Sequence, residues 1–358
     1  MIVSGEKRLK SDGLFSIFFG VMSGGLAVTA AVNLWRSRFA AASKQLARRR
    51  MLMRERLIPL ALLAGLGCSS PSGSSAGSFF AEEPLGSIVF MWRPVAGTPQ
   101  PYRISPDGTN FLPISTPSLA DKPQPSPDGN RLMYNFAGNQ YVMEYDNSLL
   151  SQVTTDRHRL WARWAPDGQR IVAVRYDDQG NQELRITELD RSADRTITPL
   201  LSAYDGYLSH PSFFPRGDSL LYVQHDNNGN GTLWIAYASG KSPRLFTSPW
   251  GNSVPRFALA RNGEAMAVTG LATGDDTPDY HTLRISKNWG GPLLSIDLGD
   301  VWVEELVFSP DAKFLVLTLE RPQSGVTWLE LLEVSTLRHR RISPEVGKSS
   351  AIDAAWGF

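Results

Sequence analysis

Cysteine and histidine are scarce in this chain of 358 residues, which contains one cysteine and five histidines. A single thiol cannot form an intrachain disulfide, and it cannot supply the cysteine cluster of a zinc site. The histidines are scattered without the spacing of metal ligands. They are His158, His210, His225, His281 and His339. We therefore expect no metal and no other cofactor.

Motifs for hydrolytic chemistry are missing as well. The sequence has no Gly-x-Ser-x-Gly nucleophile elbow. The repeats described below occupy the chain from residue 85 onward, so no room remains for the hydrolase domain that accompanies peptidase propellers. These absences predict a protein without catalytic activity.

A positive field for nucleic acid is also lacking. Residues 1–68 hold eleven basic and three acidic residues; removing them from the totals of 36 and 35 leaves 25 basic and 32 acidic residues, a net charge of about −7. A globular part of this sign does not attract a phosphate backbone. Nucleic acid is therefore not an expected partner.

A targeting pattern surrounds the single cysteine. Two arginines precede an apolar run at residues 57–67, which is too short to span a bilayer and ends at Cys68. Gly67-Cys68-Ser69-Ser70 resembles the lipobox of bacterial lipoproteins, in which the cysteine is lipidated. Residues 51–68 are thus predicted to be a lipoprotein signal peptide, and the Ser/Gly-rich residues 69–84 a flexible tether. The alternative is a buried cysteine in a short apolar helix.

A second apolar segment lies upstream, at residues 14–35. It is flanked by basic residues and is long enough to span a membrane. Lipoprotein signals normally begin a chain, so one interpretation is that translation starts at Met51 or Met53 and that residues 1–50 come from an over-extended reading frame. The other is that residues 14–35 are a true anchor and Cys68 stays unprocessed.

From residue 85 onward the chain repeats a five-residue turn followed by short strands. Most of these turns end in glycine, which supplies the positive φ angle of a tight hairpin. Successive turns end 39, 49, 46 and 49 residues apart, a spacing suited to four-stranded propeller blades. The turns are Pro125–Gly129, Trp164–Gly168, Phe213–Gly217, Leu259–Gly263 and Phe308–Ala312. Third strands are predicted to start at Tyr141, Leu184, Leu233, Leu283 and Trp328.

The sixth unit is split between the two ends of the repeat region. Three strands are expected between residues 87 and 115, but no first strand precedes them. Trp356, near the other end, falls in the column of Trp164 and Phe308. Joining both ends in one blade removes the exposed sheet edges. We predict an all-β fold: a six-bladed β-propeller over residues 85–358, closed by pairing the C-terminal strand with the N-terminal blade.

The Trp/Phe-x-Pro-Asp-Gly turns, such as Trp164–Gly168, resemble the propeller repeats of the TolB family, and the resemblance covers residues 85–358. It implies a propeller of WD-like repeats. It does not fix the function, because the same repeat occurs in scaffolds, binding modules and peptidase propellers. TolB carries an additional mixed α/β domain before its propeller, whereas this propeller follows a Ser/Gly tether.

Six side chains are predicted to form a polar collar at one mouth of the central channel. Each stands three residues before the aromatic or apolar residue at the end of the innermost strand of its blade, which we call the anchor. The collar positions therefore lie near the start of that strand. The collar residues are Lys122, Trp161, His210, Arg256, Glu305 and Asp353. Converging charges and an aromatic ring on a rigid frame suit the docking of a peptide or protein loop. The alternative is a solvated pore with Arg256 beside Glu305 and Lys122 beside Asp353.

These patterns together predict a non-catalytic lipoprotein on the periplasmic side of a bacterial membrane, most naturally the outer membrane, anchored through Cys68. Its propeller is expected to bind another envelope or membrane protein, as a subunit or accessory of a membrane complex. Tyr207, Trp250 and Trp302, in segments joining blades, are further candidate anchors unless they pack the blades. The alternative function is a carbohydrate- or peptide-processing enzyme at the channel mouth, which requires paired acids or an acid and a base.

Overall fold

The chain divides into two compact units, Met1–Ser70 and Pro71–Phe358. The computed structural model describes residues 84–145, 149–246, 256–272, 278–288, 291–345 and 349–357, all in the second unit. The apolar segment 14–35, the predicted signal peptide with Cys68, residues 69–83 of the predicted tether, and Trp250 lie outside the described residues. No helix among the described residues is long and apolar enough to cross a membrane.

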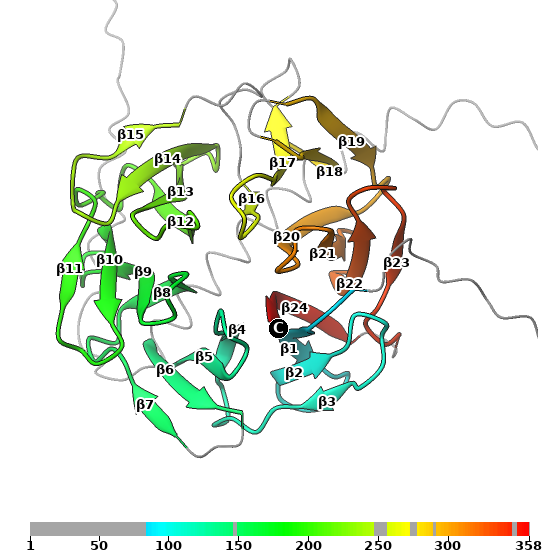
Figure 1. The fold of residues 1–358 in the computed structure, drawn as a ribbon, viewed down its shortest axis with the longest axis horizontal. Helices are drawn as coiled ribbons and strands as arrows, with labels where there is room; N and C mark the ends of the chain where they lie inside the picture. Colours follow the sequence, from blue (N-terminus) through cyan, green and yellow to red (C-terminus); the bar gives the residue numbers. More distant parts are fainter. Residues whose placement is uncertain are drawn as a thin grey trace, which may run out of the picture. The chain divides into compact units, whose positions relative to one another are not determined.

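The described strands form six antiparallel sheets of four strands each, arranged as the blades of a ring (Figure 1). Blade 1 consists, from the channel outward, of β24 (Ser350–Gly357), β1 (Ser87–Arg93), β2 (Gln100–Ile104) and β3 (Leu112–Pro113). Blade 2 consists of β4 (Asp121–Pro125), β5 (Arg131–Phe136), β6 (Asn139–Glu144) and β7 (Leu150–Gln152). Blade 3 consists of β8 (Arg159–Trp164), β9 (Arg170–Tyr176), β10 (Gln182–Glu188) and β11 (Asp194–Thr196).

The other three blades repeat this order. Blade 4 consists of β12 (Tyr207–Phe213), β13 (Ser219–His225), β14 (Gly231–Tyr237) and β15 (Arg244–Leu245). Blade 5 consists of β16 (Arg256–Leu259), β17 (Met266–Ala272), β18 (Pro278–Ser286) and β19 (Leu293–Asp297). Blade 6 consists of β20 (Trp302–Phe308), β21 (Phe314–Arg321), β22 (Val326–Glu333) and β23 (His339–Arg341).

The innermost strands contact one another in the order β24, β4, β8, β12, β16, β20 and back to β24 (Figure 1). Blade 3 therefore faces blade 6 across the channel, and blade 2 faces blade 5. The ring is closed within blade 1, where β24 pairs with β1 from Ser87↔Gly357 to Arg93↔Ser350. The prediction of six blades closed by the C-terminal strand is confirmed.

The middle strands of the blades are buried on both faces. In β13, Leu220, Leu221, Tyr222 and Val223 are all at most 3% exposed. A blade lies between two neighbouring blades, so both faces of its sheet are covered and the strand reads as a continuous apolar run instead of alternating. This packing between blades makes a rigid frame for the innermost strands.

The predicted turns connect the first and second strands of their blades. Gly129, Gly168, Gly217 and Gly263 all have positive φ angles, between 65° and 74°. The fifth turn has Ala312 in the same conformation, with φ 63°. A residue with a Cβ is disfavoured there by about 1–2 kcal/mol, so this turn stores strain that its four counterparts avoid.

Candidate functional site

Four of the six collar residues occupy backbone bulges. Lys122, Trp161, His210 and Asp353 have φ angles of 50–55°, in the left-handed region. At these positions β4, β8, β12 and β24 each carry one residue more than the strand paired with them. A bulge re-aims the side chain that it contains. Because the four bulges lie at equivalent positions, they change the direction of four collar side chains in the same way relative to their strands.

The collar side chains of blades 1 to 4 contact one another in sequence. Lys122 Nζ lies 3.0 Å from Asp353 Oδ1 and 4.0 Å from the ring centroid of Trp161. The Trp161 ring in turn lies 4.5 Å from the ring of His210, centroid to centroid. The pairing of Lys122 with Asp353, expected for the solvated-pore alternative, is present. We call Asp353, Lys122, Trp161 and His210 the collar stack.

The predicted pairing of Arg256 with Glu305 is wrong. Arg256 Nη2 lies 2.9 Å from Glu304 Oε2 instead. The register of β20 shifts between Val303 and Glu305, which makes Glu304 the extra residue of that strand. A one-residue insertion exchanges the faces to which successive side chains point, so Glu304 takes the position toward blade 5.

Glu305 faces the channel and meets Arg163 from the opposite blade. Arg163 Nη2 and Glu305 Oε1 are 3.9 Å apart, longer than a hydrogen bond. The pKa of the Glu305 carboxyl is raised to about 7, first by burial and then by the Asp353 carboxylate. Among the described residues, Glu305 Oε2 has no hydrogen-bond partner. This carboxyl is therefore protonated more readily than an exposed glutamate.

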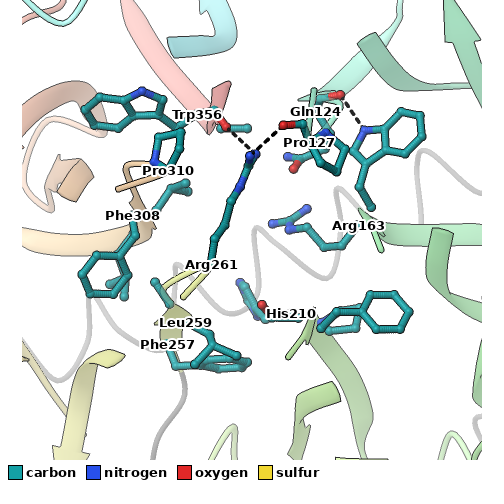
Figure 2. Close-up of a pocket in the computed structure, with 18 of the residues that line it drawn as sticks. Gln124, Pro127, Arg163, His210, Phe257, Leu259, Arg261, Phe308, Pro310 and Trp356 are labelled. Carbon is teal, nitrogen blue, oxygen red and sulfur yellow. Dashed lines mark hydrogen bonds between the residues drawn. The ribbon is translucent and has the colours of Figure 1, made fainter. Parts of the chain in front are cut away.

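A cavity of about 570 Å³ fills the channel beside this pair (Figure 2). All six innermost strands or the turns after them contribute to its wall. Its charged or titratable lining residues are Arg163, His210, Arg256, Arg261 and Glu305. The rest of the wall mixes polar groups with apolar ones such as Leu259, Pro127 and Pro310 (Figure 2). Phe257, Phe308 and Trp356 border the cavity but are at most 5% exposed, because their rings pack between the blades. A cavity of this size with a few converging polar groups is a candidate small-molecule site.

Arg261 crosses the channel at the end where the turns lie. It belongs to the turn after β16 in blade 5, and its guanidinium donates to Pro127 O at 3.1 Å and Trp356 O at 3.3 Å (Figure 2). These carbonyls belong to blades 2 and 1, on the far side of the ring. The side chain thus forms a bar across this mouth of the channel.

Sequence reasoning missed Arg163 and Arg261, although each stands out in its column. Arg163 precedes the anchor Trp164, in a position where other blades have Gln124, Ser212, Ala258, Val307 and Ala355. Arg261 occupies the turn position where four other blades have proline. A charged residue in a column that is otherwise uncharged is a signal that comparison of the repeats alone would detect.

His210 continues into a buried chain of polar groups in blade 4. Ser209 Oγ lies 2.8 Å from both His210 Nδ1 and His225 Nε2. Burial lowers the pKa of His225 to about 4 and that of His210 well below its ordinary value, so both rings are neutral. Ser209 is 1% exposed. Its hydroxyl is therefore not accessible to a substrate, despite the adjacent imidazoles.

The predicted rim aromatics that the structure describes pack within a blade or between two blades. Tyr207 stacks on His225, with 4.2 Å between ring centroids. Trp302 donates from Nε1 to His281 Nε2 at 3.3 Å and lies 6.0 Å from Tyr280, ring centroid to ring centroid. Their role as packing residues, the alternative given above, accounts for these contacts.

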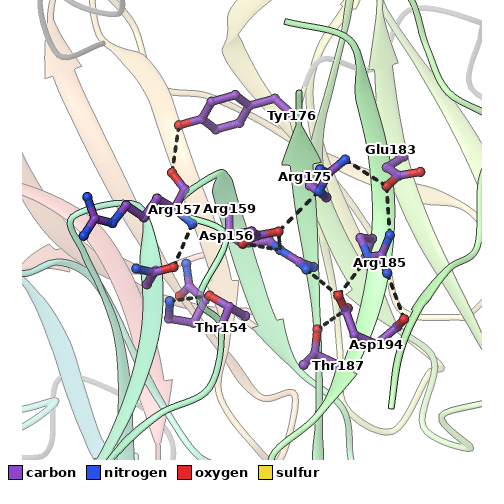
Figure 3. Close-up of polar contacts among 12 residues, drawn as sticks. Thr154, Asp156, Arg157, Arg159, Arg175, Tyr176, Glu183, Arg185, Thr187 and Asp194 are labelled. Carbon is purple, nitrogen blue, oxygen red and sulfur yellow. Dashed lines mark hydrogen bonds and ion pairs between the residues drawn. The ribbon is translucent and has the colours of Figure 1, made fainter. Parts of the chain in front are cut away.

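A second, smaller hollow of about 220 Å³ borders a closed ring of alternating charges in and beside blade 3 (Figure 3). Contacts between 2.7 and 3.4 Å link neighbouring members. In order around the ring, the members are Asp156, Arg159, Asp194, Arg185, Glu183 and Arg175. Each charge has two opposite neighbours, so this charge ring is a structural tie between the loop before β8 and the strands of blade 3. Among the described residues no cluster of His, Cys, Asp or Glu could hold a metal ion.

Solved structures share this architecture. TolB from Acinetobacter baumannii superposes with a TM-score of 0.62 at 16% identity, over 76% of this chain and 67% of that one. The chain folds as a TolB-like β-propeller. A TolB candidate from Agrobacterium tumefaciens matches with a TM-score of 0.53 at 13% identity, over 76% and 98% of the two chains.

A chain of the nidogen–laminin complex matches the TolB-like propeller with a TM-score of 0.56 at 8% identity, over 76% of this chain and 99% of that one. No protein-family model and no curated protein matches the sequence. At these identities the likeness is one of fold, and the function has to be argued from the side chains of this channel.

Proposed function

We propose that this TolB-like propeller is a non-catalytic binding protein that docks another protein on the collar stack. The observation that carries the proposal is the contact sequence Lys122–Trp161–His210, which joins a cation and two aromatic rings from three successive blades. Aromatic and cationic side chains are the commonest anchors of protein interfaces. Trp161 is half-buried, and its ring contacts both Lys122 and His210. The side chain therefore loses little conformational freedom on binding.

The proposal includes a place for the protein in the cell envelope. Lipidation at Cys68 would tether the propeller to the periplasmic side of a bacterial membrane, as a subunit or accessory of a membrane complex. More than one acyl chain gives stable attachment where a single chain does not. Mass spectrometry of the purified protein tests this part: the mature chain is expected to begin at lipid-modified Cys68. An intact peptide spanning residues 60–75 contradicts it.

The docking proposal is tested by substituting Trp161. Crosslinking in membranes identifies the partner, and the affinity of the purified pair is then measured for the Trp161→Ala variant. We expect a loss of about 2 kcal/mol or more in binding free energy with little change in melting temperature. Tyr204, 88% exposed, supplies a matched aromatic control outside the collar, Tyr204→Ala. Equal affinities for both variants and the unmodified protein contradict docking at the collar.

One observation favours the second candidate, an enzyme that acts on carbohydrates or peptides. The carboxyls of Glu305 and Asp353 come from adjacent blades, and the Asp353 charge raises the pKa of Glu305. An acid that titrates near neutral pH beside a second carboxylate is suited to general acid–base catalysis. Turnover of a glycoside or peptide panel that disappears in Glu305→Gln supports this function; absence of turnover in the unmodified protein favours docking.

A further inference from the structure

The ionic groups of the channel pair unevenly. Lys122 contacts Asp353 at 3.0 Å and Arg256 contacts Glu304 at 2.9 Å, whereas Arg163 reaches Glu305 only at 3.9 Å. Apart from this long contact, the described hydrogen bond of the Arg163 guanidinium is to the carbonyl of Ala162, the adjacent residue. Burial lowers the pKa of Arg163, and the charges of Glu305 and Asp353 offset this effect only in part.

The partner across the channel compensates this charge only in part. With a pKa of about 7, Glu305 carries a full negative charge only above neutral pH. The groups that face it from the other blades are Asp353, Lys122, Arg163, His210 and Arg256. Of these, Lys122 and Arg256 already have acidic partners, and His210 is neutral. Arg163 therefore brings a positive charge to the cavity with no acidic group within hydrogen-bonding distance of it among the described residues.

We propose that the channel cavity binds a small organic carboxylate, whose carboxylate group contacts the Arg163 guanidinium and the Glu305 carboxyl together and whose apolar body lies against Leu259 and the prolines of the turns. A guanidinium donates two parallel hydrogen bonds to a carboxylate. Protonated Glu305 donates a third to the same carboxylate, using an oxygen that has no partner among the described residues. The half-buried Leu259, Pro127 and Pro310 supply the apolar surface.

The charge of Glu305 decides between a carboxylate and other anions. A dianion such as phosphate would lie near the Asp353 carboxylate as well as Glu305, and both acids disfavour a second negative charge. A monoanion is matched by one guanidinium and one neutral acid. The site does not depend on the docking function, because Trp161 does not line the cavity.

Binding is measured on the full-length protein with hexanoate as the probe. Trp164 and Trp356 line the cavity, so tryptophan fluorescence reports its occupancy and calorimetry gives the affinity. Hexanamide and hexylammonium are the neutral and cationic counterparts, and inorganic phosphate is the polar anion. We expect saturable binding of hexanoate that is tightest of the four. Benzoate serves as a second, aromatic carboxylate. The proposal is overturned if hexanamide binds as tightly as hexanoate, or if neither hexanoate nor benzoate shows saturable binding up to about 10 mM.

Two variants assign the binding groups. Arg163→Met is expected to weaken hexanoate binding by about tenfold to a hundredfold, since a charge-assisted bidentate pair is lost. Arg216→Met removes an exposed arginine from the turn after β12, outside the cavity, and should leave binding unchanged. Unchanged affinity in Arg163→Met contradicts the proposal. If that variant does not fold, Arg163→Lys keeps the charge without the fork and should still weaken binding.

Glu305→Gln provides a readout that a purely structural role would not change. In the unmodified protein, affinity for hexanoate should fall as pH rises above about 7, because the ionised carboxylate of Glu305 repels the ligand and competes for Arg163. Glutamine donates at every pH, so this variant should bind at alkaline pH as tightly as the unmodified protein does at acidic pH. The same pH profile in both proteins contradicts the assignment.

A terminal carboxylate of a partner chain has the same chemistry as a small acid. Short apolar peptides with free and with amidated C-termini distinguish the two sources. Binding of the free-acid peptide without binding of hexanoate or benzoate shows that the carboxylate belongs to a polypeptide, and the proposal of a small ligand is then wrong.

Discussion

The indole N–H of Trp356 donates to the carbonyl oxygen of Leu85, with 2.9 Å between the two atoms, although 271 positions separate the residues in the sequence. The contact lies beside the pairing of β24 with β1 and ties the last strand to the residue that leads into the first. Trp356 is 3% exposed and packs with residues of blades 1 and 6. Ring closure is thus secured by hydrogen bonding and by burial of one large side chain.

Removing this closure should unfold the propeller. Trp356→Ala is expected to lower the free energy of unfolding by about 3–5 kcal/mol, the usual effect of truncating a buried tryptophan. Deleting β24 also exposes two sheet edges, so aggregation is expected. Denaturant unfolding followed by circular dichroism measures the first effect and light scattering the second. A deletion variant with the original melting temperature would show that β24 does not close the ring.

The strained turn of blade 6 offers a stabilising substitution. Ala312 has φ 63°, where the aligned turns have glycine. Ala312→Gly should raise the free energy of unfolding by about 0.5–1 kcal/mol, because relief of the left-handed strain exceeds the added entropy of the unfolded chain. The reciprocal control is Gly168→Ala, with φ 65°, which should destabilise. A Cβ there meets no atom closer than 3.4 Å, so conformation dominates the effect.

Glu305 should make stability depend on pH. Its pKa in the folded protein is about 7, against an ordinary value of 4.5, so the folded state holds more protons than the unfolded state between these values. The free energy of unfolding therefore falls as pH rises through this window, by at most about 3 kcal/mol. Glu305→Gln should flatten this part of the profile. Melting temperatures at pH values from about 5 to 8 test it, and parallel profiles would show that the carboxyl titrates normally.

The charge ring of blade 3 should be sensitive to loss of its most buried member. Arg159 is 2% exposed and contacts both Asp156 and Asp194. Arg159→Met leaves two acids without their shared partner, and a loss of about 3 kcal/mol is expected. Asp178, which is 84% exposed in its pair with His158, is the control, and Asp178→Asn should change stability by less than about 0.5 kcal/mol. Similar effects of the two substitutions in urea unfolding would refute this difference.

The periodic turns made the blades predictable because the restriction is local. The last residue of each turn, glycine in four of the five, adopts a positive φ angle that glycine tolerates without strain, and the spacing of these turns counts the blades. Strand ends were less well defined: β6 begins at Asn139, two residues before the predicted Tyr141. The hairpin before it uses Ala137 and Gly138, both with positive φ, and the alanine gives no turn signal in the sequence.

The arrangement of the channel was not predictable in the same way. Lys122, Trp161, His210 and Asp353 share no chemical property, yet all adopt one left-handed conformation. Packing of the innermost strands around the ring imposes this conformation, and the intrinsic backbone preferences of these four residues do not predict it. The bulges then determine which side chains face inward. For this reason the collar positions could be listed from the repeats, whereas the Arg163–Glu305 contact could not.

The order of the strands in the sequence also determines when each blade can form. Blades 2 to 6 are each encoded by one continuous segment, so each can assemble as soon as it has been synthesised. Blade 1 cannot, because β1, β2 and β3 come before the other strands that the structure describes and β24 comes after them. The inner edge of β1 therefore stays unpaired from its synthesis until the five other blades and β24 have been made. During that interval it is the place where a chaperone, or a strand from another molecule, can pair with the nascent propeller.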